Sequence, residues 1–246
     1  MALSQPYRRI CRPFKDGNYV RSVRKTYLRD SRYASDATNY VRAYRLLENH
    51  LLSTFDYVEP SDDNLSTYSH QLYQLLLRAC TEFEANAKAI LRANGYSKAA
   101  NLNTTDYFKI ERACRLSEYI ITIPVWNGKT NQLQPFKQWQ SSHSLTWYQS
   151  YNDVKHNRSA NFSQANLGNA LNAVSSVLII LFAQFNILAF DPYHIVGMHS
   201  NEDGRLSHES CFLHVELPKG WTEAECYDFD WEQLKGQEDP FQRYPF

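Results

Sequence analysis

The stretch from residue 163 to residue 190, SQANLGNALNAVSSVLIILFAQFNILAF, says more about the fold of this chain than any other. It predicts a helix that begins at Asn161 or Ser163 and carries apolar side chains at helical spacing along one face. Those side chains are Leu167, Leu171, Val174, Leu178, Leu181 and Phe185. From Ala173 to Phe190 the stretch is apolar nearly all round, but it is interrupted by Ser175, Ser176, Gln184 and Asn186. We therefore expect a helix buried at the centre of a bundle and not a membrane span.

Three segments ahead of this helix also repeat apolar residues at helical spacing. Residues 35–57 predict a helix that stops before Pro60, because proline cannot continue a helix. Residues 65–93 predict a longer one that ends where Gly95 follows. Residues 105–118 predict a third, shorter helix.

The pattern then changes to that of a strand. Residues 119–126 are rich in β-branched and aromatic side chains, and Asn127-Gly128 is the dipeptide most typical of a tight hairpin turn. We expect a two-stranded hairpin that ends near Trp139. The serines at residues 141–144 are candidate caps for the next helix.

These segments define the expected architecture. The fold class is mainly α, a helical bundle at residues 35–190 with a small β-hairpin insertion near residues 119–139. A basic N-terminal arm at residues 1–34 precedes the bundle, and an irregular acidic C-terminal extension at residues 191–246 follows it. With 246 residues and 43% hydrophobic residues, the chain can bury a substantial core.

The formal net charge is zero, but the two ends differ strongly. Residues 1–34 carry nine Lys or Arg against two Asp, whereas residues 201–246 carry four against eleven Asp or Glu. One interpretation is that both ends are solvated and lie against each other. The other is that the basic arm, with its interleaved aromatic residues, binds nucleic acid through phosphate neutralisation and base stacking.

Composition limits the cofactors and the compartment. Five cysteines without paired spacing, and no apolar leader at the N-terminus, favour free thiols in a cytoplasmic protein. A spacing similar to that of zinc ligands occurs at His208, Cys211 and His214. However, Cys211 and His214 fall on opposite faces of the strand that we expect at residues 209–217. All eight glycines are isolated, so no phosphate-cradling loop is present. We expect no metal and no cofactor.

Residues 147–158, WYQSYNDVKHNR, hold the most concentrated set of polar functional groups. At 100° per residue, Asn152, Lys155 and His156 lie within an arc of about 100°, while an apolar stripe of Trp147, Tyr151 and Val154 faces elsewhere. One face can therefore pack while its neighbour is available for chemistry. His156 could act as a general acid or base, and Lys155 and Arg158 could stabilise negative charge on a phosphate.

RNA is a suitable substrate for such a set because its own 2′-hydroxyl is the nucleophile. Cleavage then needs a proton acceptor, a proton donor and charge stabilisation, without a metal. The same residues could instead form a polar helix face that caps neighbouring helices or binds a partner.

This motif resembles that of the HEPN family, helical-bundle proteins that often dimerise and whose active members are metal-independent ribonucleases. The family signature is Arg, commonly Asn next, three variable residues and then His. Asn152 and His156 occupy the Asn and His positions, whereas Tyr151 stands in the Arg position. A tyrosine carries no permanent positive charge, so Lys155 or Arg158 would have to replace that arginine, or the protein binds without cutting.

The resemblance also takes in an acidic residue on the second helix, where Glu82, Glu84 and Lys88 occur. Glu82 and Glu84 point about 160° apart on a helix, so only one can address the site, and we favour Glu84. Glu84 and Lys88 are also an ordinary i,i+4 ion pair.

Two functional interpretations remain open from the sequence. The first is an RNA-directed, HEPN-like homodimer that acts as a metal-independent endoribonuclease of a toxin or phage-defence system. Its site would contain His156, Asn152, Lys155, Arg158 and Glu84. The second is a non-catalytic helical module that holds a protein partner. Neither involves a membrane. An open cleft that holds His156 with a cation would favour the first interpretation, and a buried imidazole would favour the second.

Overall fold

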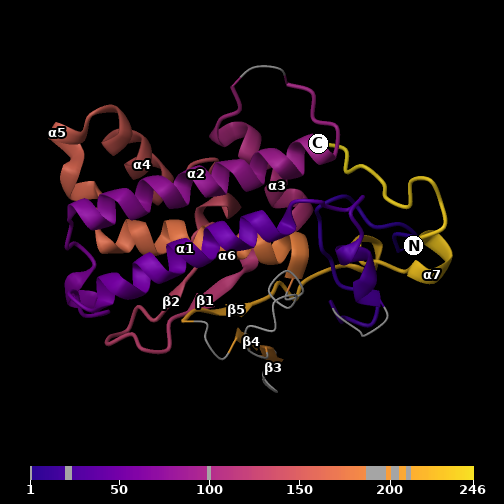
Figure 1. Ribbon diagram of the computed structural model, residues 1–246, viewed down its shortest axis with the longest axis horizontal. Helices are drawn as coiled ribbons and strands as arrows, with labels where there is room; N and C mark the ends of the chain where they lie inside the picture. The colour runs from indigo at the N-terminus through magenta and orange to yellow at the C-terminus, as the bar shows by residue number, and fades with distance from the viewer. Residues whose placement is uncertain (1, 20–23, 99–100, 187–197, 201–204, 209–211) are drawn as a thin grey trace.

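The computed structural model describes residues 2–19, 24–98, 101–186, 198–200, 205–208 and 212–246. Its body is a helical bundle, as the sequence predicts (Figure 1). Helix α6 (Leu167–Phe185) packs against α1 (Ala37–Phe55), α2 (His70–Ala93) and α4 (Thr146–His156), and α3 (Thr104–Cys114) packs on α2.

Helix α6 is the core of the bundle. By length and composition alone it could cross a membrane, but 83% of its most apolar window is buried inside the protein. It begins at Leu167, with the Asn166 side chain accepting from the backbone N–H of Asn169. The expected start at Asn161 or Ser163 is wrong, because α5 (Arg158–Asn161) and a 3₁₀ turn (Phe162–Gln164) come first. Residues 187–190 of the apolar stretch lie outside the described residues.

The boundaries of α2 and α3 also differ from the predicted ones. Helix α2 begins at His70, capped by Ser69, and not at Leu65, because residues 62–64 form a separate 3₁₀ turn. Helix α3 ends at Cys114, because Arg115 adopts a left-handed conformation with φ of +51°. A 3₁₀ turn (Leu116–Glu118) then leads into the sheet.

The hairpin is present, but its turn is not the predicted one. Strands β1 (Ile120–Thr122) and β2 (Gln132–Leu133) are antiparallel and enclose a long loop in place of a two-residue Asn127-Gly128 turn. Asp62 holds this loop, accepting hydrogen bonds from the indole of Trp126 and the backbone N–H groups of Lys129 and Thr130. A Cβ on Gly128, at φ of +143°, would lie 2.5 Å from the Asp62 carboxyl. Only glycine fits this close approach.

The C-terminal extension adds strands to the hairpin. Strand β5 (His214–Glu216) pairs antiparallel with β1, and β4 (Arg205–His208) and β3 (Met198–Ser200) continue the sheet in the order β2-β1-β5-β4-β3. Within the predicted strand at 209–217, residues 209–211 lie outside the described part of the chain. From Leu217 to Phe246 the extension is irregular, apart from a 3₁₀ turn (Glu223–Glu225) and the short α7 (Trp231–Leu234).

The two charged ends meet at the end of the molecule opposite α5 (Figure 1). Leu3 donates its backbone N–H to Cys226, and Tyr227 donates to Pro13. Ion pairs join Arg8 to Asp239 and Lys15 to Asp228, both at 2.7 Å. The interpretation that the ends lie against each other is confirmed, but its expectation that they are solvated is wrong for Arg9 and Arg12, which are buried.

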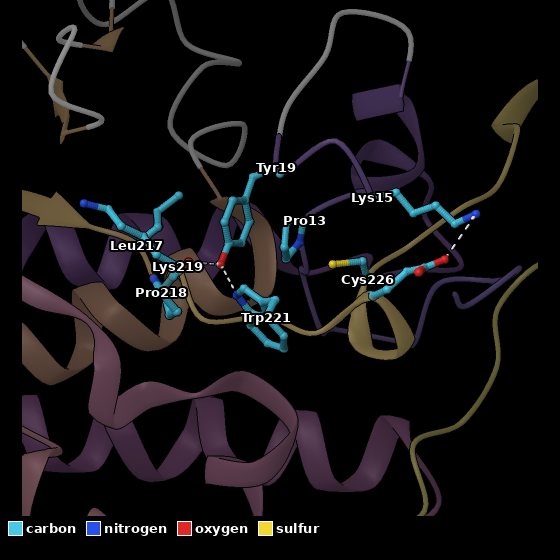
Figure 2. Close-up of a pocket in the computed structure, with 10 residues that line it drawn as sticks. Pro13, Lys15, Tyr19, Leu217, Pro218, Lys219, Trp221 and Cys226 are labelled. Atoms are coloured by element: carbon cyan, nitrogen blue, oxygen red, sulfur yellow. Dashed lines mark hydrogen bonds and ion pairs between the residues drawn. The ribbon is translucent and has the colours of Figure 1, made fainter. Parts of the chain in front are cut away.

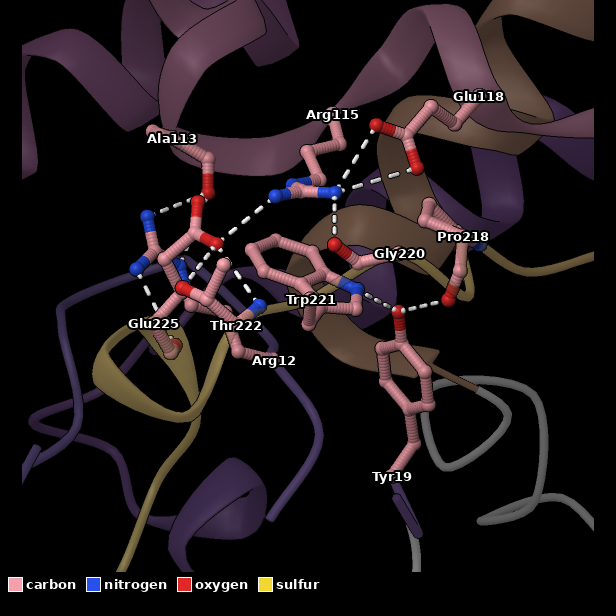
Figure 3. Close-up of polar contacts among 10 residues, drawn as sticks. All are labelled: Arg12, Tyr19, Ala113, Arg115, Glu118, Pro218, Gly220, Trp221, Thr222 and Glu225. Carbon is pink, nitrogen blue, oxygen red and sulfur yellow. Dashed lines mark hydrogen bonds and ion pairs between the residues drawn. The ribbon is translucent and has the colours of Figure 1, made fainter. Parts of the chain in front are cut away.

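Arg12 anchors this junction (Figure 3). Only 4% of Arg12 is exposed, and its guanidinium donates to the carbonyl of Ala113 at 3.0 and 2.8 Å and to that of Glu225 at 3.3 Å. The Trp221 ring lies between Arg12 and Arg115, at 5.1 and 4.7 Å from their guanidinium carbons. Arg9 is buried too and pairs with Asp36. These two arginines of the basic arm therefore face protein and not solvent.

Candidate functional site

Helix α4 lies along α2 and presents the two faces that the sequence predicts. Trp147, Tyr151 and Val154 are at most 3% exposed, so the apolar stripe is buried in the bundle. Tyr148, on the same helix, donates a hydrogen bond to Glu84 of α2. Arg158, two residues after the end of α4, lies over the ring of Tyr73 near the start of α2. The helix therefore runs back along α2, from the level of Glu84 toward the start of α2.

A cavity of about 610 Å³ lies between these helices and the chain that leads into α3. Helix α4 contributes Asn152, Lys155 and His156 to its wall, and α2 contributes Glu84. Four of the five candidate residues from the sequence are thus brought together in one open cavity, which we call the basic cavity.

Three further cations line the basic cavity, and two of them were missed from the sequence. Lys88 and Arg92 follow Glu84 at successive i,i+4 positions on α2, and Lys98 reaches in from the segment before α3. The i,i+4 repeat could have pointed to Arg92, because such residues share a helix face. Lys98 had no comparable signal, since its place depends on an ion pair with Asp106 at 2.8 Å.

Arg158 does not line the basic cavity. The helix ends at His156, Asn157 has φ of −144°, and Arg158 begins α5. Its guanidinium carbon lies 5.9 Å from the centre of the Tyr73 ring. It thus points toward the start of α2 and not toward the other four candidates.

A hydrogen-bonded network holds the floor of the basic cavity. One Glu84 oxygen accepts from the hydroxyls of Tyr148 and Tyr151, at 2.9 and 3.3 Å. The other accepts from Lys88 at 3.0 Å, so the predicted i,i+4 pair is confirmed. Lys155 donates to the Tyr151 hydroxyl at 3.0 Å. Glu84 therefore accepts from three side chains directly, and through Tyr151 it also helps to place Lys155.

The network leaves the basic cavity positively charged. Burial raises the pKa values of Tyr148 and Tyr151 above their usual range, so both hydroxyls stay neutral. The hydrogen bond with Tyr151 raises the pKa of Lys155, which keeps its charge. Lys88 and Lys98 are paired with Glu84 and Asp106, so Lys155 and Arg92 remain as the cations of the lining that make no ion pair among the described residues. Such an excess attracts phosphate groups.

Tyr151, in the Arg position of the signature, is part of the cavity's supporting wall. Its side chain is 3% exposed and packs at 5.4 Å from the Tyr148 ring. Its hydroxyl lies between Glu84 and Lys155. The residue therefore positions an ammonium group and supplies no charge of its own.

His156 is exposed on the last turn of α4, at the edge of the basic cavity. Among the described residues, nothing hydrogen-bonds to its ring, so both ring nitrogens are available for proton transfer. This is the open arrangement that favours chemistry over a purely structural role.

A second cavity, of about 680 Å³, adjoins the first across α2. It shares Glu84, Lys88 and Arg92 with the basic cavity and extends to Arg9 and Asp36 beside α1. Lys88 and Arg92 of α2 thus line both cavities.

A third cavity, of about 650 Å³, lies at the junction of the chain ends (Figure 2). Its aromatic wall is Tyr19 and Trp221, joined by a hydrogen bond of 2.5 Å from the indole to the phenol. Its two lysines are neutralised by ion pairs, Lys15 with Asp228 and Lys219 with Glu216. Without an uncompensated cation or an imidazole in its lining, it suits phosphate chemistry less well than the basic cavity.

Among the described residues, no three His, Cys, Asp or Glu side chains gather as a metal site. For the zinc-like set, His214 lies on β5, but Cys211 falls outside the described residues. Comparisons of the chain with family models, with curated proteins and with solved structures find no match. The proposal below is therefore argued from the geometry of the basic cavity.

Proposed function

We propose that this protein binds RNA in the basic cavity and cleaves it without a metal ion, with His156 as a proton-transfer group. The observation that carries the proposal is the exposed imidazole of His156 in the same open cavity as Lys155 and Arg92. An imidazole and cations around one anion are what RNA transphosphorylation needs.

In the proposed reaction, a ring nitrogen of neutral His156 accepts the proton of the ribose 2′-hydroxyl. The 2′-oxygen attacks the adjacent phosphorus, the bond to the 5′-oxygen breaks, and a 2′,3′-cyclic phosphate and a 5′-hydroxyl form. Lys155 and Arg92 stabilise the negative charge that develops on the phosphoryl oxygens. Asn152, one turn before His156, positions the substrate through its amide.

The leaving 5′-oxygen needs a proton from a second group. Glu84 does not fit that role, because its carboxylate already accepts from Tyr148, Tyr151 and Lys88. We propose that a second copy of the chain supplies the donor from its own His156, as the resemblance to dimeric HEPN proteins implies. Glu84 is then a positioning residue.

The test compares wild type, His156→Ala and the control His50→Ala on end-labelled single-stranded RNA, with a chelator present. His50 is a suitable control because it hydrogen-bonds to Gln71, away from the basic cavity. We expect wild type and His50→Ala to yield 2′,3′-cyclic phosphate ends, and His156→Ala to lose about 100-fold or more in rate.

Equal cleavage by His156→Ala and wild type would refute the role of His156. RNA binding by wild type without any cleavage would show that the protein binds RNA but does not cut it. The buried Tyr151 in place of the signature arginine favours that second candidate, because the phosphate then lacks a bidentate guanidinium contact.

A further inference from the structure

We infer that an aromatic platform beside the basic cavity, made of Tyr68, His70, Tyr73 and Phe162, stacks the bases of single-stranded RNA. Arg158 links this platform to the cavity. The inference rests on the proposed function, because it extends the path of the same RNA. It also assigns a role to Arg158, which the basic cavity does not use.

The four rings of the platform gather around Phe162. The Phe162 ring lies 5.5 Å from Tyr68 at 85°, 4.8 Å from His70 at 42° and 6.2 Å from Tyr73 at 62°. These segments are distant in sequence, so the cluster exists only in the folded chain.

The platform is open to solvent. Tyr68 is 51% exposed and is among the few large hydrophobic side chains exposed in the described part of the chain. His70 is also exposed, and Tyr73 and Phe162 are half-buried. A core cluster would hide these rings, whereas a surface that stacks bases must present them.

The backbone beneath the platform is held in place. Tyr68 pairs with Asn166 in an antiparallel bridge, and Leu167 donates its N–H to the carbonyl of Thr67 at 2.9 Å. Ser69 caps α2 directly after Tyr68, accepting from the N–H of Leu72. The rings are therefore presented on fixed backbone, which lowers the entropy cost of binding a flexible strand.

The platform continues the path that leaves the basic cavity at His156. Arg158 follows His156 by two residues and lies 5.9 Å from the Tyr73 ring. Asn161 folds this segment back onto α4, donating to the carbonyl of Asp153 at 3.2 Å. A phosphate near His156 would thus be followed by one near Arg158, with bases directed toward the rings.

The length of the path suits a short single strand. Tyr73 and Glu84 both lie on α2, eleven residues apart, which corresponds to about 16 Å along the helix. That distance matches about five stacked nucleotides at the rise of one strand. In an A-form duplex the base faces are covered by their neighbours, so the platform selects single strands.

The experiment measures fluorescence anisotropy with a labelled single-stranded RNA of mixed sequence, and with the same RNA annealed to its complement. Tyr68→Ala should weaken binding of the single strand about fivefold or more and leave duplex binding unchanged. Tyr68→Trp should restore the affinity, because it keeps an aromatic face. Tyr57→Ala is the matched control, since Tyr57 is 89% exposed and lies outside the platform.

Unchanged single-strand affinity in Tyr68→Ala would overturn the platform, as would an equal loss for single strand and duplex. A loss in Tyr57→Ala as large as that in Tyr68→Ala would also overturn it. The proposed function fails separately, if binding is unaffected when Lys155 is replaced or if cleavage persists in His156→Ala. Thermal denaturation of each variant checks that the fold is retained.

Discussion

Replacement of Lys155 by methionine removes one positive charge from the basic cavity and keeps most of the apolar stem. Lys155 suits this perturbation because, within the part of the chain that the structure describes, its ammonium group hydrogen-bonds only to the neutral hydroxyl of Tyr151. The charge is therefore free to meet a phosphate. The substitution should weaken RNA binding through electrostatics, with little effect on the buried wall of α4.

The magnitude follows from the cations in the lining. Lys88 is paired with Glu84 and Lys98 with Asp106, whereas Arg92 makes no ion pair among the described residues. For single strands, the slope of log K against log salt is about −0.7 per neutralised phosphate. If only the two unpaired cations each neutralise one phosphate, the slope is about −1.4. If all four cations do so, the slope is about −2.8. Lys155→Met should make the slope shallower by about 0.7.

The assay is a series of anisotropy titrations with labelled single-stranded RNA at increasing KCl concentrations. Lys129→Met is the matched control, because Lys129 is exposed in the hairpin loop, outside the basic cavity. Loss of affinity in Lys155→Met should be similar for different RNA sequences, since phosphates are common to all. An unchanged slope in Lys155→Met, or the same change in Lys129→Met, would refute the assignment of phosphate binding to this cavity.

The other predictions concern the network and the junction of the chain ends. Glu84→Gln should lower the free energy of unfolding by about 1–3 kcal/mol in urea denaturation, because it weakens hydrogen bonds to a charged group. The same substitution should tighten RNA binding, because it removes the carboxylate from the lining of the basic cavity. Arg12→Met should cost about 3 kcal/mol by the same method, because the buried carbonyl of Ala113 and the half-buried carbonyl of Glu225 lose their donors. For Glu225, burial raises the pKa, but hydrogen bonds from Thr222 and the ion pair with Arg115 outweigh this and lower it from 4.5 to about 2. The stability advantage of wild type over Glu225→Gln should therefore be complete above about pH 5 and disappear as the pH falls toward 2, in urea denaturation at each pH.

Each of these predictions has a clear contrary result. Weaker RNA binding in Glu84→Gln would show that its carboxylate acts on the substrate and not only on its neighbours. An Arg12→Met protein as stable as wild type would show that the hydrogen bonds from Arg12 do not stabilise the junction. A difference between wild type and Glu225→Gln that does not change with pH would contradict the lowered pKa.

The polar face of α4 could be predicted because it depends on local geometry. Helical periodicity placed Asn152, Lys155 and His156 together, and the apolar stripe on the other side fixed which face is buried. The same geometry showed that Glu82 and Glu84 cannot both address one site, and Glu84 is the one that lines the basic cavity. Arg158 does not join them, because α4 ends at His156 and Arg158 begins α5.

The turn of the hairpin shows how distant residues override a local signal. Asn127-Gly128 favours a tight turn, but the Asp62 carboxylate organises the loop from another part of the chain. Glycine is still needed there, for close approach and not for a two-residue turn. Ser141–Ser144 failed as caps for a related reason, since the side chain of Gln138 accepts from the N–H of Thr146 at the start of α4.

The sequence by itself determined the helices, the buried position of α6 and the chemistry of one face of α4, because these follow from residue spacing within single elements. Only the tertiary structure decided which cations surround His156, which arginines of the N-terminal segment are buried, and how aromatic rings gather at Phe162. Those outcomes depend on contacts between segments far apart in the chain. Their free energies come from burial and charge pairing in three dimensions, which spacing along one segment does not encode.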